Sequence, residues 1–522
     1  MAGCGGGDSS APIRSPSASE MADGGMTYAG AEPAGELAAE EGVGPGQGGD
    51  KFDLIVENAF LSAGQQPLST FSIDVDTASY SKTRMFLLDH RRLPPKDAVR
   101  IEELVNYFTY SYAGPRDEHP FAANVEIAQC PWKPAHRLVR IGIKGREMPQ
   151  TERPRSNLVF LIDVSGSMDD PNKLPLLKRG MKMLVDQLGE NDRVAMVVYA
   201  GAAGLVLPPT NGSQKQTILD ALERLQAGGS TNGGEGVRLA YQLALDNFIA
   251  GGTNRVILCS DGDFNVGTTS TGELVRFVEE NAKQNVFLTV LGFGVGNHND
   301  AMLEQISNRG NGNYAFIDTD NEARKVLVEQ MSATLVTIAK DVKIQVEFNP
   351  QTVAAYRLIG YENRLLAAEE FNDDTKDAGE IGAGHTVTAL YEIVPVGADT
   401  DVKVASVDPL RYQARGGTTT EEAKSGEMFT LKIRYKPPQE DASKLMAYAV
   451  TDTGQSFTAA SPDFKFAAAV AAFGMLLRDS QHKGDASYDA VLEIGSEGAV
   501  GDAGGYRAEF LRLVQRARDL TR

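Results

Sequence analysis

An unbroken apolar run, Leu158-Val159-Phe160-Leu161-Ile162, leads directly into a polar turn. Such a run, without polar alternation, is typical of a central parallel strand that is buried on both faces. Helical and strand patterns then alternate at short loop lengths as far as residue 338. Because parallel strands need crossover helices, this alternation predicts an α/β domain with a doubly wound, mainly parallel sheet and right-handed connections.

The periodicity of the chain places the expected elements of this domain and of its flanks. In the domain we expect strands at 158–162, 193–199, 254–259, 286–292 and 313–317, and helices near 172–188, 213–226, 234–250, 272–284, 300–308 and 321–338. Before it we expect strands at 71–76, 124–128 and 138–143 and helices at 78–90 and 98–109. After it, alternation at 342–348 and 429–435, and more weakly at 386–394 and 403–407, predicts an antiparallel sheet with one solvated face.

The C-terminal end of the chain predicts two helices. Ser461-Pro462-Asp463 has the form of an N-cap followed by proline at the first helical position, and a second helix is expected over 502–520. The apolar stretch from Phe464 to Leu477 is shorter than the ~18 residues of a membrane-spanning helix, so it predicts a buried core helix.

Composition divides the chain into four expected regions. Residues 1–50 are rich in Gly, Ala, Ser and Glu and lack apolar periodicity, so they cannot bury enough surface to offset the entropy of ordering. We expect a disordered tether at 1–50, an α+β N-terminal region at 51–154, the α/β domain at 155–338, and a β-rich and helical C-terminal region at 339–522.

Charge and cysteine content exclude several classes of partner. The net charge is −19, which argues against nucleic acid because phosphate binding needs clustered basic residues. The three cysteines form neither a disulfide framework nor a zinc spacing, and Cys259 lies in an apolar run, where it is expected to be a small core residue.

Three short segments predict a cation site. Asp163-Val164-Ser165-Gly166-Ser167 follows the first strand, Thr231 lies in a loop before a helix, and Asp261 follows the strand at 254–259. Ligands of doubly wound folds bind at the carboxyl edge of the sheet, where these side chains converge. Carboxylates and hydroxyls are hard oxygen donors that suit Mg²⁺. The alternative is that Asp163 and the serines only cap the following helix, which the three-part match disfavours.

This arrangement is similar to the metal-ion-dependent adhesion site of von Willebrand factor type A (VWA) domains. The resemblance implies that Ser165 and Ser167 bind Mg²⁺ (or Mn²⁺ or Ca²⁺) directly. It implies that Asp163, Thr231 and Asp261 bind it directly or through water, and that an acidic residue of a partner protein completes the coordination. No nucleophile elbow, HExxH motif or P-loop occurs, so we expect a binding protein and no enzyme.

The flanks resemble a bacterial group of VWA proteins often called YfbK-like. The stretches that carry this resemblance are Ser69–Tyr80, Arg100–Phe108, Ala339–Lys343 and Arg357–Arg364. The resemblance implies a cell-envelope protein without naming its partner. We therefore expect a metal-dependent protein-binding role in the envelope. The alternatives are an assembly factor working with an AAA-type ATPase, a metal-dependent hydrolase, and a scaffold whose site binds nothing.

Met1-Ala2-Gly3-Cys4 resembles the end of a bacterial lipobox, which would make Cys4 a lipidation site and the protein a membrane-anchored lipoprotein. The apolar core of a signal peptide does not precede it in this sequence, so a misassigned start, a shortened chain and chance resemblance stay open. Without lipidation, a periplasmic or extracellular location is expected.

Two further motifs are interpreted as structural. The acidic stretch Asp74-Val75-Asp76 resembles a cation site, but we interpret it as the start of a helix capped by Thr77. Trp132 is expected to anchor the core or a contact between domains. The glycine-rich stretch Gly292–Gly296 follows a late strand without the spacing of a dinucleotide loop, and predicts a turn near the cation site.

Overall fold

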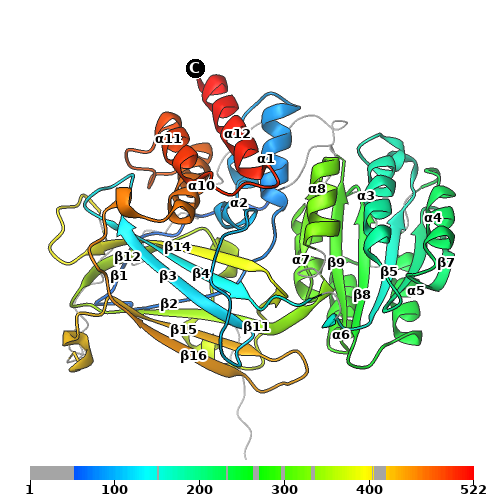
Figure 1. Ribbon diagram of the computed structural model, residues 1–522, viewed down its shortest axis with the longest axis horizontal. Helices are drawn as coiled ribbons and strands as arrows, with labels where there is room; N and C mark the ends of the chain where they lie inside the picture. Colours follow the sequence, from blue (N-terminus) through cyan, green and yellow to red (C-terminus); the bar gives the residue numbers. More distant parts are fainter. Residues whose placement is uncertain are drawn as a thin grey trace, which may run out of the picture. The chain divides into compact units, whose positions relative to one another are not determined.

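The computed structural model describes residues 52–149, 152–230, 233–262, 270–294, 300–330, 335–402, 404 and 419–522, all of which belong to one unit (residues 48–522). This unit contains an α/β domain and a layered assembly of two β-sheets and a group of helices (Figure 1). Cys4 and the expected tether lie outside the described residues, as does nearly all of the expected strand at 403–407.

The α/β domain is built on a six-stranded sheet in the order β10-β9-β8-β5-β6-β7. Its strands are β5 (Ser156–Asp163), β6 (Asp192–Tyr199), β7 (Ala203–Asn211), β8 (Thr253–Ser260), β9 (Val286–Phe293) and β10 (Tyr314–Ile317). All neighbours are parallel except β6 and β7. The predicted doubly wound fold is confirmed, and every residue of β5 is buried. Strand β7 was not expected, because Pro208 and Pro209 disfavour a strand; an edge strand tolerates them.

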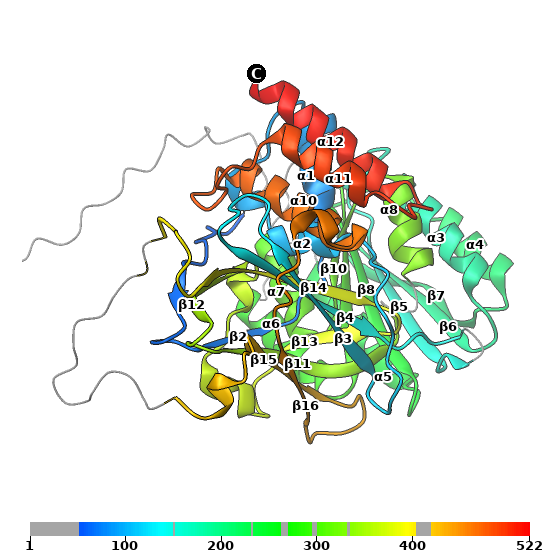
Figure 2. The same ribbon diagram turned by 60° about the vertical axis from the view of Figure 1, so that its left-hand side comes forward.

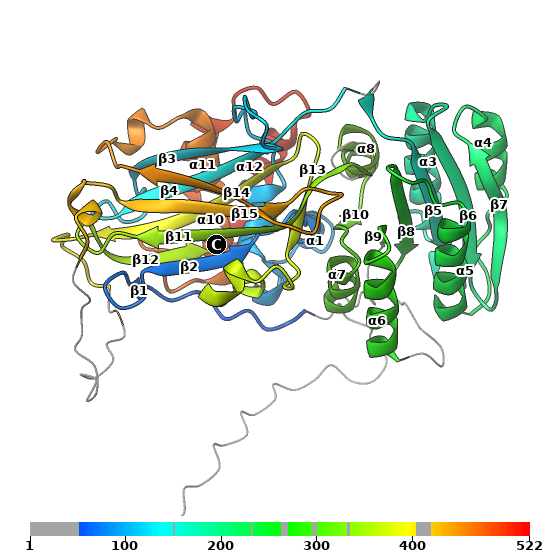
Figure 3. The same ribbon diagram turned by 90° about the horizontal axis from the view of Figure 1, so that it is seen from below.

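Helices cover both faces of this sheet, as Figure 3 shows. One face carries α3 (Leu174–Gln187), α4 (Lys215–Glu223) and α8 (Asp320–Arg324), and the other carries α5 (Gly233–Asp246), α6 (Thr271–Ala282) and α7 (Asp300–Arg309). The expected helix at 321–338 is too long: α8 passes into a π-helical turn at Lys325–Glu329, and strand β11 has begun by Thr337. The alternating pattern of β11 therefore starts earlier than the sequence indicated.

The two flanks share two antiparallel sheets. The first has the order β1-β12-β14-β4-β3, with β1 (Leu61–Ser62), β12 (Val353–Ile359), β14 (Thr386–Pro395), β4 (Arg137–Gly145) and β3 (Phe121–Gln129). The second has the order β13-β11-β15-β16, with β13 (Gly379–Gly382), β11 (Thr337–Phe348), β15 (Phe429–Lys436) and β16 (Lys444–Val450), and β2 (Leu68–Ser72) also pairs with β11. Because β4 pairs with β14 and β2 with β11, strands from before and after the α/β domain complete each other's sheets.

The two sheets pack face to face, with Ile141 and Tyr391 of the first and Ile344 and Leu431 of the second in one apolar core. The other face of the first sheet is covered by α2 (Ile101–Asn106), α10 (Pro462–Arg478), α11 (Tyr488–Gly498) and α12 (Tyr506–Thr521) (Figures 1 and 2). Helix α10 is buried along most of its length, which confirms the predicted core helix, and the Ser461 side chain caps it by accepting from the Phe464 amide. Helix α11 was not expected. Among the described helices, none is long and apolar enough to cross a membrane.

The Asp74-Val75-Asp76 stretch contacts both the α/β domain, at Tyr314, and the segment that follows β12, at Arg364. The strand expected at 71–76 ends at Ser72, and α1 (Ala78–Leu88) follows. Thr77 occupies the N-cap position of α1, but its side chain makes no capping bond, so that part of the interpretation is wrong. The two carboxylates instead accept hydrogen bonds from Arg364 Nη2, at 2.9 and 3.1 Å, and Asp76 also accepts one from the Tyr314 amide of β10. An arginine and a backbone amide thus fill the place that a cation would take.

Candidate metal centre

The predicted carboxylates meet at one edge of the α/β sheet. Asp163 is the last residue of β5, and Asp261 directly follows β8. These strands are neighbours at the point where the strand order reverses, because the chain runs from β5 outward to β7 and then returns to β8 on the other side. Such a switch point opens a crevice at the carboxyl ends of the strands, where doubly wound folds bind their ligands.

The turn after β5 presents one carboxylate and two hydroxyls. Asp163 is fully buried, and its Oδ1 accepts a hydrogen bond from the Ser165 amide at 2.8 Å. This bond closes the turn, so that Ser165 Oγ and Ser167 Oγ lie 3.0 Å apart. Ser165 is buried and Ser167 is exposed. The oxygen set is therefore open to solvent at Ser167 and closed at Asp163 and Ser165.

A second loop is fixed against this turn by the backbone. The Gly228 amide donates to the Val164 carbonyl at 2.7 Å, and the Gly166 amide donates to the Gly229 carbonyl at 3.1 Å. Gly229 has a φ of +89°, a conformation that favours glycine. These bonds hold the loop beside the serines as far as Ser230. Thr231, the next residue and a predicted ligand, lies outside the described residues.

Lys173 is a residue of the site that the sequence analysis missed. Its ammonium lies 3.0 Å from Asp261 Oδ2 and donates to the Ser167 carbonyl at 2.9 Å, so it links the second carboxylate to the first turn. Gly294, at φ +73°, leaves room for it, because a Cβ there would lie 2.3 Å from Lys173 Cε. This position agrees with the turn predicted for the glycine-rich stretch. The sequence did offer a signal for this role, because Lys173 is the only basic residue from 163 to 173.

Burial controls the electrostatics of Asp163. It raises the pKa of this carboxyl to about 6, against the lowering effect of its hydrogen bonds with Ser165, and the charge of Asp261 raises it further. Burial disfavours the ionised form, whereas a nearby positive charge favours it. Lys173 supplies such a charge to Asp261. The pocket around Asp163 thus favours either a proton or a cation.

The oxygen set fits a hard divalent cation. Mg²⁺ binds oxygens at ~2.1 Å in an octahedron, where adjacent ligands are about 3.0 Å apart. The separation of Ser165 Oγ and Ser167 Oγ matches that edge, although it is also an ordinary hydrogen-bond length. The structure thus brings Asp163, Ser165, Ser167 and Asp261 to one edge of the sheet, and these residues would hold the ion.

Comparison with known proteins matches most of the chain to family models. Residues 157–333 match the von Willebrand factor type A domain, and residues 333–520 match the C-terminal domain of uncharacterized protein YfbK. Residues 47–140 match a further model described as von Willebrand factor. The matched ranges cover the α/β domain, the C-terminal flank and most of the N-terminal flank.

The chain is also similar to individual known proteins. The chain is 43% identical to uncharacterized protein YfbK of Escherichia coli over 479 residues, 90% of this chain and 81% of that protein. It is 29% identical to inter-alpha-trypsin inhibitor heavy chain H2 of Homo sapiens, over 34% of this chain and 20% of that protein. A solved von Willebrand factor type A structure from Catenulispora acidiphila is 16% identical over 78% of this chain and 92% of that one, with a TM-score of 0.41. The 43% identity to the Escherichia coli protein over most of both chains, together with the family models, shows that the chain belongs to the YfbK family of von Willebrand factor type A domain proteins.

Proposed function

We propose that the VWA domain binds Mg²⁺ through Asp163, Ser165, Ser167, Thr231 and Asp261, and through it an acidic side chain of a partner protein. The observation that supports this most is the convergence of two hydroxyl oxygens, 3.0 Å apart, with two carboxylates at the switch point of the sheet. These are oxygen ligands of the kind that Mg²⁺ prefers.

Charge balance gives the reason for an acidic partner. Asp163 and Asp261 are the two carboxylates of the set, and Asp261 already shares its charge with Lys173. The protein thus neutralises a divalent ion only in part. When bound, the ion supplies a positive centre with open coordination positions beside the exposed Ser167. A carboxylate from another protein is the ligand that such a centre attracts most strongly.

Calorimetric titration of the metal-stripped full chain with Mg²⁺ and Mn²⁺ tests the ion. We expect saturable binding that Asp163→Ala and Thr231→Ala each weaken at least tenfold. Asp169→Asn is the matched control, because Asp169 is an exposed acid of the same turn and is absent from the proposed set. Binding that survives Asp163→Ala, or equal losses in Asp169→Asn, would contradict the proposed ligand set.

Metal dependence of capture tests the partner. Immobilised wild-type protein should retain an envelope protein in Mg²⁺ and release it in EDTA, and the Asp163→Ala protein should retain none. Substituting the acidic residues of the captured protein in turn should identify one whose loss abolishes capture. Equal capture with and without metal would refute the adhesion mechanism.

We also propose that Cys4 carries a lipid that anchors the protein in the cell envelope, because Met1-Ala2-Gly3-Cys4 resembles the end of a lipobox. Expression from the native locus in cells fed a labelled fatty acid tests this. Label should enter the wild-type protein and be absent from Cys4→Ser, which should leave the membrane fraction. Unlabelled wild-type protein would remove the anchor from the proposal.

A further inference from the structure

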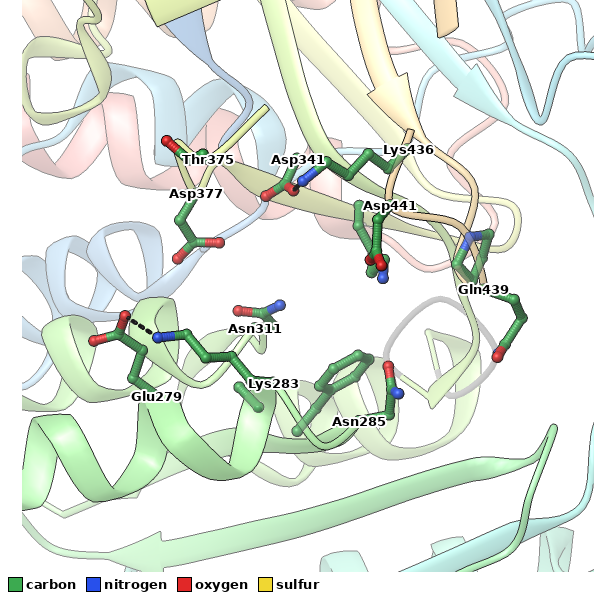
Figure 4. A pocket seen from close by; sticks show the side chains of 14 residues that line it. Glu279, Lys283, Asn285, Asn311, Asp341, Thr375, Asp377, Lys436, Gln439 and Asp441 are labelled. Atoms are coloured by element: carbon green, nitrogen blue, oxygen red, sulfur yellow. Dashed lines mark hydrogen bonds and ion pairs between the residues drawn. The ribbon is translucent and has the colours of Figure 1, made fainter. Parts of the chain in front are cut away.

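A second group of acidic residues lies far from the proposed Mg²⁺ site in the fold. It lines a cavity of about 550 Å³ between the C-terminal end of α6 and the strands β11 and β15 (Figure 4). The α/β domain contributes Glu279, Lys283, Asn285 and Asn311 to this cavity, the sheet contributes Asp341 and Lys436, and the loop between β15 and β16 contributes Asp441. Because α6 ends where β9 begins, this cavity lies at the amino edge of the parallel strands, opposite the edge that holds Asp163.

Three carboxylates converge beside the cavity. Oxygens of Asp341, Asp377 and Glu380 lie within 4.8 Å of one another. The β-sheet brings them together, because β13 pairs with β11 and the register between them shifts on either side of Ala339. Asp341 falls within the second irregularity, between Ala339 and Val342. Asp377 precedes β13 and is exposed, whereas Glu380 lies within β13.

Glu380 is the residue that indicates a ligand. Its side chain is 7% exposed, and neither of its carboxylate oxygens has a hydrogen-bond partner among the described residues. A buried carboxylate without a partner is costly, so such groups are normally paired, protonated or bound to a metal. Both of its orphaned oxygens are buried, and one of them lies within 4.8 Å of carboxylate oxygens of Asp341 and Asp377.

The basic residues nearby leave this charge incompletely balanced. Lys436 Nζ contacts Asp341 Oδ2 at 2.6 Å and also donates to the Asp374 carbonyl at 2.7 Å. Within the described ranges, Asp341 is the only one of the three acids with an ion pair within 4 Å. Lys340 and Arg255 act on Glu380 only through their charge. One contacting ammonium therefore faces three carboxyl groups.

We propose that Asp341, Asp377 and Glu380 form a second cation site, which binds Ca²⁺. Ca²⁺ takes six to eight oxygens at roughly 2.3–2.6 Å in irregular geometry, so a partly open acidic cluster with space for water suits it better than Mg²⁺. Asn311 lies on the opposite side of the cavity from Asp341 (Figure 4) and belongs to the α/β domain. The site thus lies where the α/β domain meets the second sheet.

A shared proton is the competing explanation. Although the Asp377 side chain is exposed on one side, neighbouring atoms partly desolvate its carboxyl, and this desolvation, followed by the charge of Asp341, raises the pKa of Asp377 to about 7. Burial, followed by the charge of Asp341, raises the pKa of Glu380 well above its usual value. A proton held between carboxyl groups would also relieve their repulsion. At a pH of about 8, the cation site predicts saturable Ca²⁺ binding, whereas the shared proton predicts none. The titration is therefore made at that pH.

The experiment uses the metal-stripped full chain carrying Asp163→Ala, so that the proposed Mg²⁺ site is disabled. Calorimetric titration with Ca²⁺ should show one site, and Mg²⁺ should bind at least tenfold more weakly. Glu380→Gln and Asp377→Asn should each weaken Ca²⁺ binding at least tenfold. Asp441→Asn, which removes an acid of the same cavity outside the cluster, should change the affinity less than twofold. Lys436→Met should tighten binding, because it releases Asp341.

Two outcomes would overturn this proposal. One is the absence of saturable Ca²⁺ binding up to millimolar concentration in a folded Asp163→Ala protein, which would leave the shared proton as the explanation. The other is unchanged binding in both Glu380→Gln and Asp377→Asn. Asp377 is exposed, so its variant keeps the test valid even where the Glu380 variant misfolds. Failure of the Mg²⁺ site affects neither result, because every protein in the comparison lacks Asp163.

Discussion

Arg84 is the side chain whose loss should most weaken the connection between the α/β domain and the helices. It extends from α1, is almost fully buried, and contacts acids from two other parts of the chain. Its guanidinium pairs with Asp318, with Glu322 at 2.8 Å, and with Glu509 of α12 at 2.9 Å. Its Nη1 also donates to the Tyr107 hydroxyl at 3.1 Å.

The magnitude follows from the burial of these partners. Arg84→Met keeps much of the aliphatic volume but leaves Asp318, below a tenth exposed, without its main counter-charge, and removes from the buried Glu322 the guanidinium that contacts it, so that Lys325 is left to offset the charge of Glu322. Breaking a buried ion pair from one side destabilises a protein by about 3–5 kcal/mol, because the remaining charge stays buried and uncompensated. The urea dependence reaches about 3 kcal/mol per molar in small proteins and increases with size, so the unfolding midpoint of this larger unit should fall by at most about 1 to 2 M.

Urea unfolding followed by two probes measures this. Trp132, the only tryptophan, is buried against Glu392 in the layered sheets, so its fluorescence follows that part, whereas far-UV circular dichroism follows the whole chain. The double variant Arg84→Met/Glu322→Gln should recover part of the loss, because it removes one of the stranded charges. A midpoint shift below about 0.3 M, or no recovery in the double variant, would refute the argument from uncompensated burial.

Three further predictions concern single sites. Burial and then the charge of Glu362 raise the pKa of Glu102 from 4.5 to about 7, so its stabilising effect is complete below pH 4.5 and is lost as pH rises through about 7. Glu102→Gln should remove roughly 3 kcal/mol of this dependence between those pH values, measured as the change in urea midpoint, and an unchanged pH profile would contradict it. Lys173→Met should tighten Mg²⁺ binding several-fold in calorimetry, because a neighbouring positive charge is removed. Lys173→Arg, which keeps the charge, should not tighten it. Weaker binding by the Lys173→Met protein would mean that Lys173 chiefly positions Asp261. Gly312→Ala should lower the thermal midpoint by several degrees, because its Cβ would lie 1.6 Å from the Leu288 carbonyl oxygen. Gly272→Ala, with open space around it in helix α6, should leave the midpoint unchanged or raise it slightly. Equal midpoints for the two variants would disprove the close approach.

The sequence alone was enough to predict the α/β domain and the sheet edge at which Asp163 and Asp261 lie. The apolar run of β5 and the alternation of strands and helices are local patterns, and each element carries its own periodicity. Strands that end at one edge of a parallel sheet bring Asp163 and Asp261 together whatever the flanks do. The same local signals predicted α10 and its Ser461 cap.

Tertiary structure decided what depends on distant partners. Strand β7 can contain two prolines because it lies at the edge of its sheet. Strands β2 and β4 pair with β11 and β14, which lie more than 200 residues away in the sequence. Arg364 lies beside Asp74 and Asp76 although they are distant in sequence, and the irregular register of β11 brings Asp341 close to Glu380. Periodicity reports which face of an element is buried, but not what it is buried against, so the balance of buried charge is fixed only when the chain has folded.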